Sequence, residues 1–282
     1  MPIDRGRYRE QSRHTWAEMA SGWEDRRAWL MDMTVPVSDW LLDKLDPQPG
    51  QTILEIAAGT GDLGFRVAQR VGQQGRVICT DFAAEMVDVA RRQGDARGVT
   101  NVEYRVLDAE TMDIDDDSVD GVLCRFGYML MADPAAALSE TRRVLRAGRP
   151  LVFAVWRIAD ANPWAAVPGL TLVRRGHMPV PEPGAPGIFA LAEPARIHEL
   201  VTRPGFGEPE LAEVTLDFRF GNFDDFWNFL VRLAGPLAAV IKALPDDERA
   251  ATREAIMQNV AAHRNTDGSY VFPASAWCVL AR

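Results

Sequence analysis

The chain has 282 residues and a formal net charge of −9. This length suits one large α/β domain with insertions, or a core domain with a smaller lid. The acidic balance argues against a large nucleic-acid interface, and no apolar run approaches the roughly 20 residues that cross a bilayer. Because the polar N-terminus also lacks the apolar segment of a signal peptide, we expect a cytosolic protein that is not integral to a membrane.

The three cysteines, Cys79, Cys124 and Cys278, each lie in an apolar, strand-like run. None has CxxC spacing or a neighbouring histidine. We therefore expect free buried thiols rather than disulfides, and we expect no metal site.

Residues 1–48 are expected to form helices that precede the sheet and cover a site at its edge. Trp16, Met19 and Trp23 recur at helical spacing, and Pro36 restarts a second helix. The turn at residues 46–50 then leads into the first strand.

Residues 49–158 alternate between apolar strand-like runs and amphipathic helices, which indicates a parallel sheet. The predicted strands are Thr52–Ile56, Val77–Asp81, Val102–Leu107, Ser118–Cys124 and Leu151–Trp156. Right-handed crossovers place them in a doubly wound sheet, so the predicted fold class is α/β.

The remaining residues are expected to add two strands and two insertions. Prolines interrupt residues 159–193, which we interpret as an irregular insertion, and residues 194–220 supply a helix and a strand at Leu211–Phe220. Residues 221–269 form a helical cap insertion, whose apolar stripe is either plain packing or the roof of a substrate pocket. Residues 270–282 supply the last strand, which makes the mostly parallel sheet seven-stranded.

Acidic side chains follow each of the first three strands. Glu55 precedes the glycine-rich turn at residues 59–64, Asp81 ends the second strand, and Asp108-Ala109-Glu110 follows the third. Ligands of open α/β sheets bind outside the carboxyl ends of the strands, so these acids should converge on one crevice.

The glycine turn matches GxGxxG, and Asp81 lies about 20 residues further on, so a nicotinamide dinucleotide is considered first. However, Glu55 and Asp62 would repel a pyrophosphate at this helix N-terminus. The carboxylates favour a cationic ligand without phosphate. S-adenosylmethionine is such a ligand, with a ribose diol for Asp81 and an adenine amino group for Asp108.

Glu55-x-Ala57-x-Gly59-x-Gly61, Asp81 and Asp108-Ala109 resemble the motifs of class I S-adenosylmethionine-dependent methyltransferases. Within that group the chain resembles the ubiquinone/menaquinone-biosynthesis type of small-molecule methyltransferase, over about residues 50–160. The resemblance implies a Rossmann-like methyltransferase fold and S-adenosylmethionine as cofactor. It also implies methyl transfer to carbon or oxygen of a small aromatic or quinone-like acceptor. A nicotinamide oxidoreductase and a small-metabolite N-methyltransferase are kept as alternatives.

The resemblance also implies roles for individual residues. Glu55 would anchor the methionine ammonium, and Asp81 would accept both ribose hydroxyls; the structural alternative for Glu55 is a cap. The remaining candidate cofactor-binding residues are Trp16, Ala57, Gly59, Thr60, Gly61, Phe82, Met86, Asp108, Ala109, Glu110, Cys124 and Arg125. Met86 could instead be core, Asp108 a helix cap, and Arg125 the partner of a surface acid. Ala57 stands where glycine is common, which is tolerable if its φ is negative.

Methyl transfer mainly requires alignment of the acceptor and exclusion of water, so a dedicated base is optional. If a base is used, a histidine near neutral pKa is the natural candidate. His14 in the N-terminal helices and His177 in the proline-rich insertion are the candidates, because both segments could cover the pocket.

Overall fold

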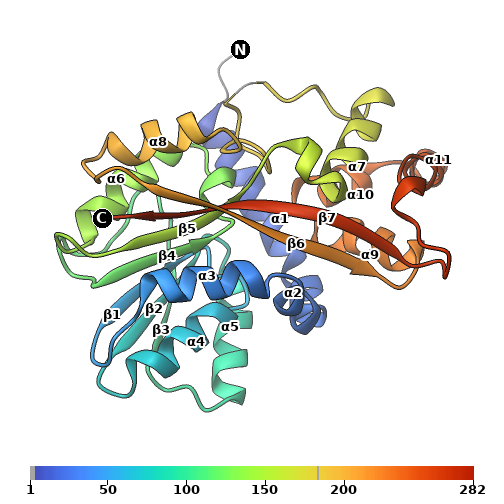
Figure 1. Cartoon of the computed structure of the whole chain (residues 1–282). Helices are drawn as coiled ribbons and strands as arrows, with labels where there is room; N and C mark the ends of the chain where they lie inside the picture. Colours follow the sequence, from blue (N-terminus) through green and yellow to red (C-terminus); the bar gives the residue numbers. More distant parts are fainter. Residues whose placement is uncertain (1–3, 183) are drawn as a thin grey trace.

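The computed structural model describes residues 4–182 and 184–282. Its centre is a seven-stranded sheet in the order β3-β2-β1-β4-β5-β7-β6 (Figure 1). The strands are β1 Thr52–Ile56, β2 Arg76–Asp81, β3 Val102–Val106, β4 Gly121–Arg125, β5 Leu151–Trp156, β6 Glu210–Phe220 and β7 Tyr270–Ala281. Strands β1 to β5 pair in parallel, whereas β7 is antiparallel to both β5 and β6. The predicted α/β fold with a mostly parallel seven-stranded sheet is confirmed.

Helices cover both faces of this sheet (Figure 1). One face carries α3 Val35–Leu45, α4 Asp62–Val71 and α5 Ala84–Ala96, and the other carries α6 Pro134–Val144 and α8 Pro194–Thr202. The central strands are buried on both sides, as is usual for a parallel sheet between two helical layers. The carboxyl ends of β1, β2 and β4 therefore open at one edge.

Two N-terminal helices precede α3. They are α1 Arg5–Asp25 and α2 Arg27–Met33. Helix α1 packs against α5 and against the cap helix α9. This long helix therefore bridges the core and the cap.

The cap lies at the far end of β6 and β7 (Figure 1). It consists of α7 Pro163–Arg174, α9 Phe223–Leu233, α10 Pro236–Ala243 and α11 Asp246–Asn259. The predicted irregularity of the proline-rich insertion was wrong for residues 163–174, which are helical despite Pro168. Trp164 and Leu172 of this helix are buried, and we attribute its persistence to this packing outweighing the one backbone hydrogen bond that proline removes.

Strand β7 contains Pro273, although β7 lies inside the sheet. Pro273 is opposite Asp217 of β6, but β5 pairs with β7 only from Ala276 to Ala281. Because β7 has no second neighbour at Pro273, the missing N–H is tolerated there.

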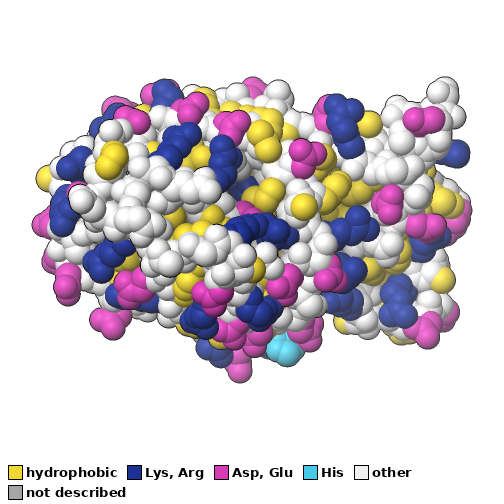
Figure 2. Space-filling model, turned by 90° about the horizontal axis from the view of Figure 1, so that it is seen from below, with side chains coloured by type: hydrophobic (Ala, Val, Ile, Leu, Met, Phe, Trp, Pro, Cys, Tyr) yellow, Lys and Arg dark blue, Asp and Glu magenta, His cyan; other side chains and the backbone are white. Residues whose placement is uncertain are grey.

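Acidic and basic side chains intermingle on the face that carries α3, α4 and α5 (Figure 2). Among the described helices, none is long and apolar enough to cross a membrane alone; α9 and α10 pass that test only as a pair bent by 99°. The apolar face of α9 is buried inside the protein.

Candidate active site

A deep cavity lies at the carboxyl edge of the sheet, between the core, α1 and the cap. Its empty space, with the open mouth included, is about 1530 Å³. Its lining extends from the glycine loop and the ends of β1, β2 and β4 to the cap helices. Eleven of the sixteen residues predicted for the site line it: Trp16, Glu55, Ala57, Gly59, Asp81, Phe82, Met86, Asp108, Ala109, Glu110 and Arg125.

Glu55 lies at the bottom of the cavity, and only 2% of it is exposed. Its Oε2 has no hydrogen-bond partner among the described residues. Burial raises the pKa of Glu55 to about 8, while the charge of Arg125 opposes this shift. The close packing depends on Gly64 of α4, because a Cβ there would lie 2.2 Å from Glu55 Oε2. Glu55 therefore lines the cavity without an ion-pair partner among the described residues.

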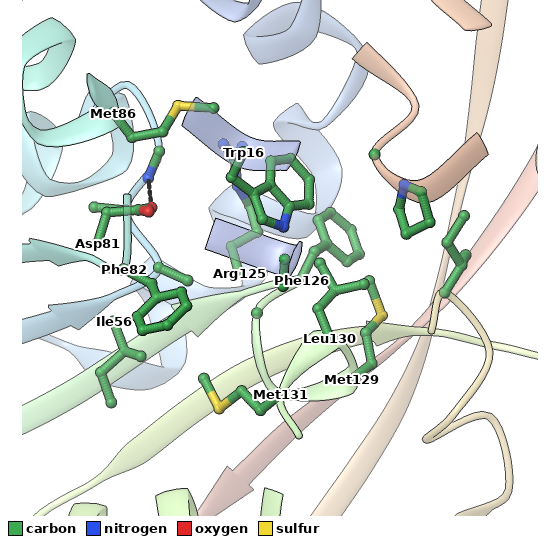
Figure 3. Close-up of a pocket in the computed structure, with 18 of the residues that line it drawn as sticks. Trp16, Ile56, Asp81, Phe82, Met86, Arg125, Phe126, Met129, Leu130 and Met131 are labelled. Carbon is green, nitrogen blue, oxygen red and sulfur yellow. Dashed lines mark hydrogen bonds between the residues drawn. The ribbon is translucent and has the colours of Figure 1, made fainter. Parts of the chain in front are cut away.

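Asp81 holds the glycine loop in place. Its Oδ2 accepts a hydrogen bond of 2.9 Å from Gly59 N, and its Oδ1 accepts one of 3.0 Å from Ala83 N. Figure 3 shows the Gly59 bond as a dashed line. Burial raises the pKa of Asp81, and these backbone donors oppose the shift. The carboxylate is fixed in the cavity wall with lone pairs left for further donors.

Phe82 and Met86 lie beside Asp81 at this end of the cavity, with Trp16 of α1 near them (Figure 3). Trp16 packs edge-on against Trp23, with ring centroids 5.7 Å apart. The side chain of Met86 is buried, so it is both cavity wall and core. These apolar groups provide flat surfaces on which an aromatic base could lie.

Asp108 is engaged by α1, which the sequence did not indicate. Its Oδ1 accepts a bond of 2.9 Å from Glu110 N, and its Oδ2 forms an ion pair with Arg9. Arg9 Nη1 also lies 3.5 Å from Glu110 Oε2. No helix follows Asp108 in the described residues before β4, so the predicted alternative of a helix cap was wrong. Asp108 instead stabilises the turn after β3 and anchors α1, so a ligand amino group would share it with Arg9.

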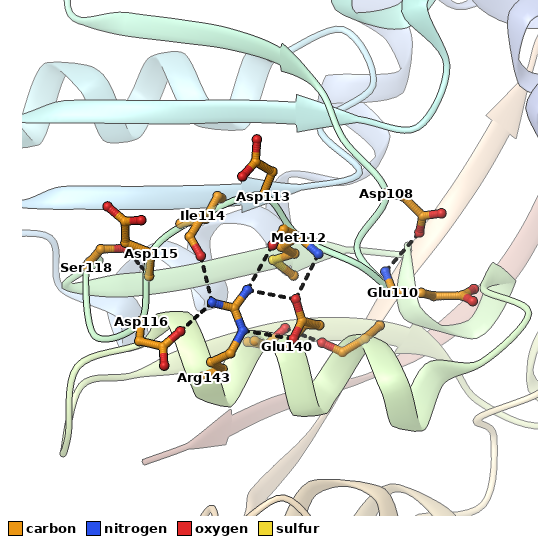
Figure 4. Close-up of polar contacts among 12 residues, drawn as sticks. Asp108, Glu110, Met112, Asp113, Ile114, Asp115, Asp116, Ser118, Glu140 and Arg143 are labelled. Atoms are coloured by element: carbon orange, nitrogen blue, oxygen red, sulfur yellow. Dashed lines mark hydrogen bonds and ion pairs between the residues drawn. The ribbon is translucent and has the colours of Figure 1, made fainter.

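Arg143 of α6 positions the loop that follows β3 (Figure 4). Its Nη1 donates to Ile114 O at 2.7 Å, and its Nη2 donates to Met112 O at 2.9 Å. Ion pairs with Glu140 and Asp116 hold the guanidinium and raise the pKa of Arg143. Arg143 thus stabilises the loop that carries Asp108.

Thr60 and Gly61 do not line the cavity. Thr60 Oγ1 donates at 2.7 Å to Asp62 Oδ2, and Asp62 also pairs with Arg27 and Arg97. Gly61, with φ 78°, faces Phe65 and Ala90. Asp62 therefore places a carboxylate in the first turn of α4.

Ala57 has φ 52°, so the expectation of a negative φ was wrong. The chain leaves β1 in a sharp turn that is fixed by a 2.9 Å bond from Ala58 N to Thr80 O. A non-glycine residue in this region carries strain, which concentrates at functional sites. Phe126, with φ 64°, is strained in the same way at the end of β4.

The opposite end of the cavity is aromatic. Phe126 stacks on Trp156 with centroids 4.0 Å apart, Trp156 meets Trp164 at 5.2 Å, and Trp164 meets Phe218 at 4.9 Å. The remaining apolar lining of this end includes Met129, Leu130, Met131, Ile188 and Phe229. Figure 3 shows Phe126, Met129 and Leu130 together. We call this end the aromatic end of the cavity.

Asn162, which the sequence did not single out, positions Trp164. The buried Asn162 amide donates at 3.0 Å to Ser275 O and accepts at 3.1 Å from Ser275 N, both on β7. Its Oδ1 also accepts from Trp164 Nε1 at 3.3 Å. An asparagine between Ala161 and a helix-starting proline was the only available signal.

Cys124, His14 and His177 do not line the cavity either. Cys124 is fully buried under Gly127, where a Cβ would lie 2.6 Å from its Sγ. The His14 side chain is 76% exposed and pairs with Glu18 on the outer face of α1. His177 lies in the cap with its Nε2 3.3 Å from Glu248 Oε2. Neither histidine is therefore among the described residues that could contact a ligand in this cavity.

The sheet order, the antiparallel seventh strand and the glycine loop edged by acids define the Rossmann-like methyltransferase fold class. The model of the ubiE/COQ5 methyltransferase family matches residues 38–158 of this chain. One relative is the ubiquinone/menaquinone biosynthesis C-methyltransferase UbiE of Francisella tularensis subsp. novicida, 32% identical over 131 residues. The match spans 43% of this chain and 52% of that relative, so the chain covers about half the length of the curated protein.

Solved structures share the fold over more of the chain. A Bacillus halodurans protein superposes with a TM-score of 0.60 at 20% identity, covering 87% of this chain and 97% of that one. A SAM dependent methyltransferase from Aquifex aeolicus gives a TM-score of 0.51 at 18% identity, over 68% of this chain and 92% of that one. At these identities the likeness describes the fold, which includes strands outside the family match.

Proposed function

We propose that this protein transfers a methyl group from S-adenosylmethionine to a carbon or oxygen atom of a small, apolar, ring-containing acceptor. The observation that carries the proposal is a single cavity with acids along one end and aromatic rings at the other. When bound, S-adenosylmethionine supplies an electrophilic methyl group. The chain's own task is then to align the acceptor and exclude water.

The acidic end fits the cofactor. The unpaired Glu55 Oε2 suits the ammonium group, and Asp81, with Gly59, suits the ribose diol. Phe82 and Met86 suit the faces of adenine, with Asp108, Ala109 and Glu110 along its edge. A dinucleotide fits less well, because Asp62 places a negative charge in the first turn of the helix whose N-terminus would hold its pyrophosphate.

The aromatic end determines the acceptor class. Among the described residues that line it, none is a carboxylate, lysine or histidine, so it favours an apolar ring over a charged amine. Tyr8 is a poor base, because burial raises its pKa to about 12 and its hydroxyl donates to Leu130 O at 2.9 Å. The acceptor therefore has to supply its own nucleophilic carbon or ionised oxygen.

The proposal is tested by incubating the protein with methyl-labelled S-adenosylmethionine and a panel of phenols, naphthols and quinols, with small amines alongside. Label should pass to one of the ring compounds. Met131→Glu places a charge at the aromatic end and should reduce that transfer at least tenfold while S-adenosylhomocysteine still binds. The control Leu170→Glu, on α7 where Leu170 is 48% exposed, should leave transfer unchanged. Transfer to amines alone would contradict the acceptor class.

A further inference from the structure

Arg125 is a cation inside the cavity without an acidic partner. It ends β4, and only Arg9 and Arg125 carry a positive charge among the described residues lining the cavity. Arg9 pairs with Asp108 and Glu110, whereas no described carboxylate lies within 4.0 Å of Arg125. The predicted alternative, a surface acid as partner, was therefore wrong.

Two hydroxyl groups at the junction of α2 and α3 hold the guanidinium. Arg125 Nη1 donates to Thr34 Oγ1 at 2.6 Å and to Ser38 Oγ at 2.9 Å. Arg125 Nη2 contacts only Met31 Sδ, at 3.7 Å. A guanidinium has five N–H donors. In Arg125 only Nη1 donates to oxygen atoms, and the Nε and Nη2 donors have no oxygen acceptor among the described residues.

The guanidinium is half-buried and has no counter-charge among the described residues. Removing a charge from water is unfavourable unless it is paired, and neutral hydroxyls do not neutralise it. A guanidinium with free adjacent N–H groups is the preferred protein group for two-point binding of an oxyanion.

Glu55 carries the opposite charge in the same cavity when it is ionised. Its Oε2 is also buried and unpaired, and it lines the same cavity. The two opposite charges influence each other without forming an ion pair. An amino-acid group, with its ammonium on Glu55 and its carboxylate on Arg125, would satisfy both.

We propose that Arg125, held by Thr34 and Ser38, is an oxyanion-binding site of this cavity. The oxyanion is either the carboxylate of the cofactor's amino-acid group or an ionised oxygen of the acceptor. This inference rests on the proposed function, and it names the group that recognises the negative charge of one of the two reactants.

The test compares S-adenosylhomocysteine with methylthioadenosine, which lacks the amino-acid group, on the wild type and on Arg125→Met, Arg125→Lys and the exposed control Arg91→Met. If the cofactor carboxylate is bound, the preference for S-adenosylhomocysteine should fall at least tenfold in Arg125→Met. It should be partly restored in Arg125→Lys and unchanged in Arg91→Met. If the acceptor oxygen is bound, that preference should persist, while the S-adenosylhomocysteine complex loses at least tenfold in affinity for para-nitrophenolate.

Changes below twofold in both ligand comparisons would overturn the oxyanion site. Thermal unfolding separates binding from folding, because removal of a half-buried charge without a counter-charge should leave Arg125→Met at least as stable as the wild type. If Arg125→Met does not fold, the guanidinium is structural, and Arg125→Lys should then show neither ligand effect. A wild type that binds neither nucleoside but retains Arg125-dependent para-nitrophenolate binding would contradict the proposed function and leave the oxyanion site standing.

Discussion

Glu55 must be charged to hold an ammonium group, yet its surroundings favour the neutral acid. Burial raises its pKa to about 8, well above the usual 4.5. The pKa of Glu55 is higher in the folded protein than in the unfolded chain. The contribution of neutral Glu55 to the free energy of unfolding is therefore present at low pH, and it is lost as the pH rises through about 8. Ligand binding and proton release are therefore coupled at this residue.

We predict that S-adenosylhomocysteine binding at pH 7 releases about one proton from Glu55, and that little is released at pH 9. Calorimetric titration in buffers of different ionisation enthalpy measures this number directly. The Glu55→Gln variant should release none, bind more weakly and be more stable than the wild type above pH 8. An equal release at both pH values would show that Glu55 is not the group that ionises.

The sequence predicted which residues line the site better than it predicted their backbone conformations and contact partners. The order of Glu55, Gly59 and Asp81 follows from strand patterns and a glycine turn, which are local. The positive φ of Ala57 and the partners of Arg125 depend on Gly127 and on the α2–α3 junction, which lie far away in the sequence. Tertiary contacts of this kind leave no local pattern.

Helix α1 closes the cavity over its acidic end. Arg9 pairs with Asp108, Arg5 Nη1 lies 2.5 Å from Asp133 Oδ2, and Tyr8 donates to Leu130 O. These contacts come from one side of the helix, and two of them are ion pairs with partly exposed members. The first turns of α1, held in this way, can open without unfolding the core, since such pairs contribute only about 0–1 kcal/mol each. The buried Met19 and Ala20 keep the second half of the helix in place.

We predict that Arg9→Ala accelerates both association and dissociation of S-adenosylhomocysteine, each up to roughly fivefold. Stopped-flow fluorescence of the tryptophans near the cavity, Trp16 and Trp23, should report both rates. High salt should accelerate the wild type toward the variant, because it screens the same ion pair. The surface variant Arg196→Ala, on α8, should behave like the wild type; unchanged rates in Arg9→Ala would mean that α1 does not gate the site.

Helices and strands with a strong periodicity of apolar residues were predictable from the sequence, and elements stabilised by packing in the cap were not. The alternation that marks β6 and β7 appears within ten or so residues of sequence. Helix α7 forms in spite of Pro168, because its buried side chains pack against α11 and β7. The polar contact of Asn162 with Ser275 joins residues more than a hundred positions apart.

The cavity exists only in the whole molecule, because three distant parts of the chain build it. The family match at residues 38–158 contains the acidic end, whereas Trp16, Trp164 and Phe218 lie outside that segment. The cofactor end was therefore predictable from motifs, and the acceptor end required the fold. The aromatic rings, rather than the relatives, therefore indicate the class of acceptor.

Calorimetric titration of the intact protein with S-adenosylhomocysteine, and with NADH in parallel, distinguishes the two cofactors. We predict micromolar binding of S-adenosylhomocysteine at one site per chain and no binding of NADH. Binding of NADH alone would contradict the roles given to Glu55, Asp81 and Asp62.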